Sequence, residues 1–261
     1  MLYCVFGFGP DGKLIPGKNL KGKLVSYRKK GRHLTSSLIG PISQNCGGMR
    51  VDSKGNIYIG MLFLPEGYKP PKVLEKDLGW SALVGSVIRF GPDGGRWAVT
   101  HPKLKSRYPS EFSLPVPKDV VTLTMENGNV FVGADKAYPE MAPFSGSVGT
   151  SARSGIGRSN CACRSARFDM DMYDRLYIPN AVTNRIRIYD NAGNIILQFG
   201  SYGNMDSSGP DSRIPKPDIG LGWPIGVGVS DKHIYISDML NRRVLRADKT
   251  FKIEKTVPIT E

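Results

Sequence analysis

The feature that most constrains this chain is a run of four short strands within residues 167–200. In residues 168–173, apolar and polar side chains alternate, as they do along a strand with one buried face. Short apolar runs follow at 176–178 and 195–197, and isoleucine alternates with arginine at 185–188; residues typical of tight turns separate these segments. This pattern predicts an antiparallel meander. Because such a small meander does not bury both of its faces alone, we expect it to pack against similar units.

The chain contains several such units. The pattern of residues 171–178 recurs at 52–59 and 229–236, and more weakly at 125–132. A four-stranded unit that recurs every ~40–50 residues is typical of a β-propeller blade. We attribute the extra length between some copies to inserted loops. The aromatic residues at equivalent positions of the predicted second strands are Tyr58, Phe131, Tyr177 and Tyr235.

Residues 224–244 resemble an NHL repeat. They contain a Pro-x-Gly-hydrophobic strand, a turn, an Ile-Tyr-hydrophobic-x-Asp strand and an Asn-Arg-Arg-Val segment in place of the repeat's Asn-Arg-hydrophobic, and residues 179–190 match the second half of this pattern. The resemblance covers most of residues 48–258. It implies an all-β protein, a β-propeller of NHL-like four-stranded antiparallel blades. The NHL-repeat family includes scaffolds, RNA-binding proteins and a few enzymes, so the resemblance specifies fold better than function.

We predict a single β-propeller domain over residues 1–261. Residues 3–12 copy residues 86–94, so the chain is expected to begin within a blade. About four and a half blades are then present, an incomplete set of a six-bladed ring that lacks its upstream blades. No apolar run approaches ~18 residues, so we expect no membrane span.

The N-terminal region is strongly basic. Residues 1–50 hold nine Lys and Arg against one acidic residue, which gives +8 of the whole chain's +13. One interpretation of the basic region 18–50 is a surface for nucleic acid or another anionic partner. The other is a solvated strand and loop whose lysines protect a sheet edge from pairing. The region has few aromatic side chains for stacking on bases, which favours the second interpretation.

Three cysteines precede predicted innermost strands. Cys161 and Cys163 precede that of the 167–200 unit, and Cys46 precedes that of an earlier unit. We expect all three at one mouth of the channel, with the weak copy around Phe131 lying between their two units. One interpretation is that these cysteines form a disulfide or remain buried thiols. The other is that they bind zinc or copper as thiolates. A disulfide would indicate an oxidising, extracytoplasmic compartment; the sequence does not otherwise predict localisation.

Polar residues cluster at the corners between the second and third strands of two units. Asp and Asn at such corners suit calcium, which the related six-bladed sugar-lactone hydrolases hold on the channel axis. Alternatively, these side chains hydrogen-bond the corner itself. The three histidines are far apart in the sequence, unlike the set that the zinc lyase of this family requires, and we expect His233 to be exposed in a turn. The candidate ligand-binding residues are Asn180, Asn184, Arg185, Asp238, Asn241 and Arg242.

These observations predict a non-catalytic binding or scaffolding module. It would present loops at one channel mouth to a protein or another large ligand. The alternatives are a metal-dependent hydrolase or lyase of the propeller-lactonase type, and nucleic-acid binding through residues 18–50. No catalytic residue is assigned.

Overall fold

The structure is a computed structural model. It describes residues 48–62, 64–69, 72, 85–98, 100, 115–125, 128–141, 167–181, 183–204, 207, 211–212 and 216–250, with the backbone of four short strands nearer the N-terminus. Those four strands form two hairpins, β1 (Gly7–Phe8) with β2 (Leu14–Ile15) and β3 (Tyr27–Lys29) with β4 (Arg32–Leu34). The fold is all-β, as predicted, and no helix among the described residues has the length and apolar character needed to cross a membrane.

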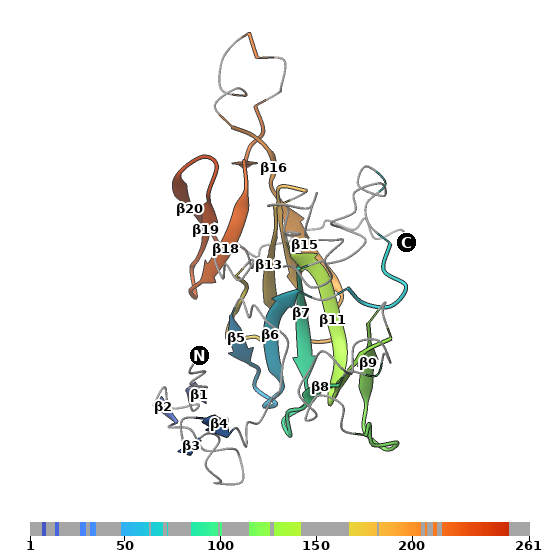
Figure 1. The fold of residues 1–261 in the computed structure, drawn as a ribbon. Coiled ribbons are helices and arrows are strands. Elements are labelled where there is room, and N and C mark those ends of the chain that lie inside the picture. Colours follow the sequence, from blue (N-terminus) through green and yellow to red (C-terminus); the bar gives the residue numbers. More distant parts are fainter. Residues whose placement is uncertain are drawn as a thin grey trace, which may run out of the picture.

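Four antiparallel sheets, which we number I to IV, make up the body of the molecule (Figure 1). Sheet I has the order β8 (Arg96–Ala98), β10 (Val130–Val132), β9 (Thr122–Thr124). Sheet II has the order β11 (Ala134–Met141), β7 (Gly85–Phe90), β6 (Ile57–Leu62), β5 (Met49–Val51). Sheet III has the order β12 (Asp169–Met170), β13 (Leu176–Asn180), β14 (Arg185–Tyr189), β15 (Ile195–Phe199). Sheet IV has the order β18 (Pro224–Val229), β19 (His233–Asp238), β20 (Arg243–Asp248).

The sheets pack in the order I, II, III, IV, with one hydrophobic core in each interval. Figure 1 shows sheet I, in green, and sheet IV, in red, on opposite sides of sheets II and III. Phe131 and Trp97 of sheet I meet Ile57, Ile59, Ile88 and Phe90 of sheet II. Tyr58, Val87 and Tyr138 of sheet II meet Phe168, Leu176, Ile178 and Tyr189 of sheet III. Tyr177, Ile186 and Ile188 of sheet III meet Leu221, Val227, Ile234 and Ile236 around sheet IV.

The four predicted equivalent aromatics lie on the inner strands β6, β10, β13 and β19 of four different sheets, as expected. Tyr58, Phe131 and Tyr177 each fill the core toward the next sheet, and the sequence neighbours of Tyr58 and Tyr177 fill the core on the other side. Tyr177, for example, lies in the core with sheet IV, whereas Leu176 and Ile178 lie in the core with sheet II. This follows from the alternation of side chains along a strand.

Sheets I and II exchange a strand, which the sequence did not predict. β8 follows β7 in the chain but pairs with β10, and β11 follows β10 but pairs with β7. The two connections cross in contact: a Cβ on Gly95 would lie 2.0 Å from the Val132 carbonyl oxygen, and one on Gly133 would lie 2.2 Å from that of Gly94. Glycine at both positions therefore permits the crossing, and Gly133 also has a φ of +83°.

The exchange changes which units are neighbours. We expected the unit around Phe131 to separate the two cysteine-bearing units, and this expectation is wrong. Sheet II packs directly on sheet III, and sheet I covers the other face of sheet II. The direct contact includes an ion pair from Arg50 on β5 to Asp169 on β12, with Nε 2.5 Å from Oδ1.

In the described part of the chain, no strand pairing joins sheet IV to sheet I. β1, from the N-terminal copy of residues 86–94, pairs with β2. Residues 251–257, which the sequence predicts as the outer strand of the last unit, lie outside the described residues. That the ring is incomplete therefore stays a prediction.

The double-sided packing of β13 predicts how stability responds to truncation. Ile178→Ala should lower the free energy of unfolding by about 2–5 kcal/mol, because Ile178 is fully buried in the core between sheets II and III. Ile195→Ala, on the outer strand of the same sheet, removes a side chain that is 50% exposed. This substitution should change the free energy of unfolding by no more than about 0.5 kcal/mol. Urea unfolding followed by circular dichroism measures both; equal effects would contradict the packing described here.

Candidate functional site

The candidate residues at the two strand corners lie at the same end of sheets III and IV. Asn184 and Asp238 both hydrogen-bond to the backbone of one short segment, residues 220–223. Asp238 Oδ1 accepts hydrogen bonds from the backbone N–H groups of Gly222 and Trp223, both at 2.9 Å. With its amide turned so that Nδ2 faces them, Asn184 donates to the carbonyl oxygens of Gly222 (2.9 Å) and Leu221 (3.1 Å).

Asp238 is fully buried and accepts hydrogen bonds on both carboxylate oxygens. Asn241 Nδ2 donates to its Oδ2 at 2.7 Å, and Arg243 Nε donates to the same oxygen at 3.2 Å. Buried carboxylates are stable only when charge and hydrogen-bond partners compensate for lost solvation, and Asp238 has both. The alternative that corner residues hydrogen-bond the corner itself therefore describes Asp238 and Asn241.

Arg243 was missed by the sequence analysis. Besides binding Asp238, its Nη2 donates to the Gly220 carbonyl oxygen. Asn184-Arg185 and Asn241-Arg242 look equivalent in the sequence, but the strand register differs by one residue. Asn180 pairs with Arg185 and Asp238 pairs with Arg243, so Asn184 is equivalent to Arg242. Both have a left-handed backbone, with φ of +53° and +50°.

The other three candidates have smaller roles in this cluster. Asn180 is buried, and its Oδ1 accepts a hydrogen bond from the Thr183 N–H at 3.1 Å. Arg185 is half-buried at the start of β14, and Arg242 is exposed. The structure thus brings Asn184, Asp238 and Asn241 together, with Asn180 and Arg185 at the adjoining corner.

These contacts hold the two ends of the segment 203–219, which connects sheet III to sheet IV. Its ends are joined by a parallel pair, β16 (Ser201–Tyr202) with β17 (Gly220–Leu221), at the end of sheets III and IV in Figure 1. Asn241 Nδ2 donates to the Gly203 carbonyl oxygen at 2.8 Å, which fixes the first end, while Arg243 contacts Gly220 at the second. A Cβ on Gly203 would lie 2.8 Å from the Cα of Gly220, so the strands approach more closely than larger residues permit. We call Asn184, Asp238, Asn241 and Arg243 the corner clamp.

An open pocket of about 460 Å³ lies beside the clamped ends. Its volume falls within the range of ~300–1,000 Å³ that is usual for small-ligand sites. Lys216 and Asp218 supply exposed charges of both signs at its wall. The lining residues are Phe199, Gly200, Ser201, Lys216, Pro217, Asp218 and Ile219.

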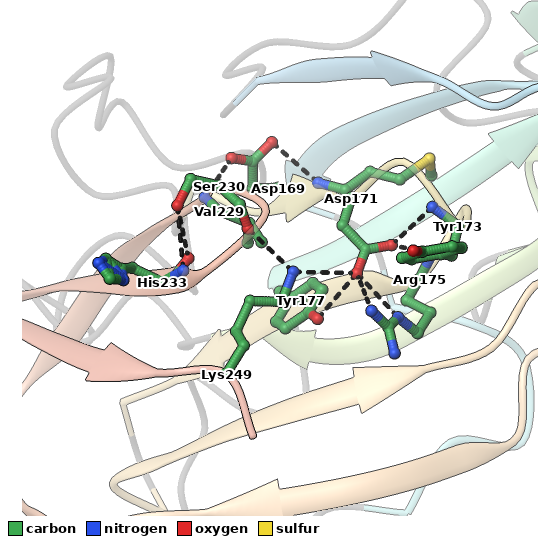
Figure 2. Close-up of polar contacts among 10 residues, drawn as sticks. Asp169, Asp171, Tyr173, Arg175, Tyr177, Val229, Ser230, His233 and Lys249 are labelled. Carbon is green, nitrogen blue, oxygen red and sulfur yellow. Dashed lines mark hydrogen bonds and ion pairs between the residues drawn. The ribbon is translucent and has the colours of Figure 1, made fainter. Parts of the chain in front are cut away.

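A second polar cluster, which the sequence analysis also missed, is centred on Asp171 (Figure 2). The Asp171 Oδ2 atom accepts hydrogen bonds from Arg175 Nε (2.8 Å), Tyr177 Oη (2.9 Å) and Lys249 Nζ (3.3 Å). The side chains of Asp171 and Lys249 are only 3% and 2% exposed. Lys249, which follows β20, also donates to the Ser230 carbonyl oxygen at 3.0 Å, so the cluster fastens sheet IV to sheet III.

The surroundings of Asp171 set its protonation. Burial alone would raise the pKa of this carboxyl, but the hydrogen bonds from Arg175, Tyr177 and the Tyr173 N–H together hold the pKa below its usual value. Burial raises the pKa of the Tyr177 hydroxyl, and the neighbouring Asp171 charge raises it further. The cluster is therefore a carboxylate held by two cations and a neutral phenol.

The remaining sequence predictions have mixed outcomes. Cys46, Cys161 and Cys163 lie outside the described residues, so the disulfide and thiolate hypotheses stay predictions. Within the described residues, no group of three or more His, Cys, Asp or Glu side chains is arranged to hold a metal ion. His233 is at the turn as predicted but half-buried, with Nδ1 3.6 Å from Asp248 Oδ1. From the basic region, Arg50 is described, and it is ion-paired.

Asp171→Asn should lower the free energy of unfolding by about 3 kcal/mol near pH 7, because it leaves Lys249 buried beside a neutral group. The pKa of Asp171 is lower in the folded chain than its ordinary 3.8. The contribution of Asp171 to the free energy of unfolding is therefore complete above pH 3.8 and is lost as the pH falls through the folded pKa. Since the pKa of Tyr177 is raised above its ordinary 10.0, its contribution is lost as the pH rises through the folded value.

The control for this variant is Asp190→Asn. Asp190 makes the same turn contacts, to Asn194 N (2.8 Å) and Nδ2 (2.9 Å), without a buried cation. The free energy of unfolding of Asp190→Asn should be close to that of the unmodified chain. Asp171→Asn should lower this free energy and should also make it depend less on pH in the acidic range. If the free energy of unfolding of Asp171→Asn falls with decreasing pH as steeply as that of the unmodified chain, the role assigned to Asp171 is contradicted.

Asp238→Ala should release the ends of segment 203–219. It leaves the N–H groups of Gly222 and Trp223 without their acceptor, at a cost of about 1–3 kcal/mol for each buried group left unpaired. Amide hydrogen exchange in a peptide spanning residues 216–224 should accelerate. Asp248→Ala on the same sheet removes a side chain that is 71% exposed and should leave that exchange unchanged; similar exchange in both variants would show that Asp238 is not the anchor.

Comparison of the chain with models of known protein families and with curated proteins found no match. The function of this chain therefore has to be inferred from its own geometry.

Proposed function

We propose that this chain is an NHL-like β-propeller module that binds rather than catalyses, and that it presents segment 203–219 to a protein or another large ligand. The observation that carries this proposal is the corner clamp. Four side chains from two sheets are committed to holding the two ends of one connecting segment. Anchoring both ends lowers the entropy that such a segment loses when a ligand orders it.

The packing of sheets supports the propeller part of the proposal. In sheets I, II and III, the equivalent aromatic of the middle strand is buried against the next sheet. The innermost strands of three successive sheets also meet, because the Asp169 carboxylate on β12 binds Arg50 on β5 and the Val229 N–H on β18 (2.7 Å). Innermost strands that converge in this way are what radially arranged blades require.

The state of the buried charges supports binding over catalysis. A general acid or base has to reach the substrate and exchange a proton with it. Asp171 and Asp238 are instead engaged by Arg, Lys, Tyr, Asn and backbone donors, and neither lines the pocket beside segment 203–219. The charged residues at that pocket, Lys216 and Asp218, are exposed and suited to contacts with a partner surface.

Site-specific photo-crosslinking tests this proposal. A photo-reactive amino acid in place of Lys216, in segment 203–219, should form discrete adducts in an extract of the source cells. The matched control replaces Asp231, which is exposed at the opposite end of sheet IV, and should give none. Because Asp238 anchors the segment, Asp238→Ala should weaken the Lys216 adducts.

Two results would contradict the proposal. One is equal crosslinking from both positions, which would place the binding surface elsewhere or show no specificity. The other is stoichiometric calcium, zinc or copper in the purified protein together with lactone hydrolysis, which would favour the metal-dependent enzyme.

A further inference from the structure

The corner turn of sheet IV, residues 239–242, places an arginine where the backbone favours another residue. Arg242 and Asn184 occupy equivalent positions, and both have a left-handed backbone. Asparagine adopts this conformation more readily than arginine, and the Asn184 side chain also serves the corner clamp. The Arg242 side chain is exposed and makes no hydrogen bond or ion pair with the described residues. Because no contact within the described chain compensates for the unfavourable backbone, the position indicates a contact with another molecule.

Arginine is in excess at this end of sheets III and IV. Of the four arginines at the strand ends there, only Arg243 has an acidic partner, the buried Asp238. Within the described ranges, no acidic side chain pairs with the other three. The connecting segment adds one exposed cation, Lys216, and two exposed acids, Asp211 and Asp218. The four corner arginines are Arg167, Arg185, Arg242 and Arg243.

The opposite end of the same two sheets has the reverse balance of charge. Its turns carry more described acids than cations. An acidic partner is therefore attracted to the corner arginines and repelled from the other end. The acids at that end are Asp171, Asp174, Asp190, Asp231 and Asp248, and the cations are Arg175, Lys232 and Lys249.

Two aliphatic side chains are exposed in the same turn as Arg242. Met239 is 49% exposed and Leu240 is 62% exposed. A nucleic acid fits this turn poorly, because bases stack on aromatic rather than aliphatic side chains. An anionic membrane surface fits poorly as well, because it would repel the exposed Asp211 and Asp218 of the neighbouring segment. A protein segment that combines acidic and apolar side chains matches both the arginines and the aliphatic pair.

We propose that the corner turn binds an acidic segment of a partner protein. Carboxylates of that segment pair with the corner arginines, Arg242 above all, and one apolar side chain packs on Met239 and Leu240. This inference rests on the proposed function, because it names the chemistry of the partner that binds at this end of the sheets.

Fluorescence anisotropy with the full chain tests the inference. The probe is a labelled peptide of Glu-Glu-Leu repeated four times, and a peptide with Gln in place of each Glu is the control probe. The acidic peptide should bind, more weakly as salt increases, and the Gln peptide should not. Arg242→Asn should weaken binding about two- to fivefold, the size expected for an exposed ion pair. Leu240→Ser should weaken it about tenfold, as expected when a leucine is buried on binding.

Two substitutions at the opposite end are the matched controls. Lys232→Asn removes the same charge from an exposed turn of sheet IV, and Met172→Ser removes an apolar side chain that is 70% exposed. Both should leave the affinity for the acidic peptide unchanged. Arg242→Asn should also have a thermal midpoint no lower than that of the unmodified chain, since Asn suits the left-handed backbone. Its loss of affinity therefore does not come from unfolding.

Three results would overturn the inference. The first is an affinity that survives both Arg242→Asn and Leu240→Ser, and the second is an equal loss in Lys232→Asn. The third is binding of phosphatidylserine vesicles or oligo-dT, but not of the peptide, that Arg242→Asn weakens. Peptide binding that depends on Arg242, without adducts from Lys216, would refute only the proposed role of segment 203–219. Lys216 adducts that neither salt nor Arg242→Asn reduces would refute only this inference.

Discussion

The arrangement of the sheets depends on the contacts that the Asp169 carboxylate makes. This carboxylate lies on β12 of sheet III and binds Arg50 of sheet II through Oδ1 and the Val229 N–H of sheet IV through Oδ2. The Asp169 side chain is 13% exposed and that of Arg50 is 44% exposed, so water screens the ion pair mainly from the arginine side. One carboxylate thereby links strands of three sheets, β5, β12 and β18. The parallel bridge from Arg167 to Gly226 extends this contact between sheets III and IV.

Burial on both faces makes the middle strands of sheets II and III depend on two neighbouring sheets. β13 is buried along its whole length, with alternate side chains in two cores. No sheet of this kind is stable alone, because covering one face leaves the other exposed to water. The same rule explains why Tyr235 on the last described sheet is exposed while its equivalents are buried.

The two ends of the sheets have different polar networks with different consequences. At one end, the ion pair between Asp171 and Lys249 fastens sheet IV to sheet III. At the other end, the corner clamp holds a connecting segment and leaves Lys216 and Asp218 exposed beside a pocket. The first network joins two sheets, and the second holds the two ends of the segment 203–219.

The sequence alone determined the positions of several strands. The alternation at 185–188 and the recurring pattern of residues 171–178 and 229–236 placed β13, β14, β18 and β19 within one or two residues, because side-chain alternation and turn conformation are local properties. For the candidate site, sequence reasoning found Asn184, Asp238 and Asn241, whose residue types suit strand corners, but it missed Arg243 and Lys249. Only the tertiary structure decided those roles, the strand exchange and the contact between sheets II and III. Each depends on a close approach between residues distant in the sequence, such as Gly95 with Val132 and Asp171 with Lys249, which local patterns do not specify.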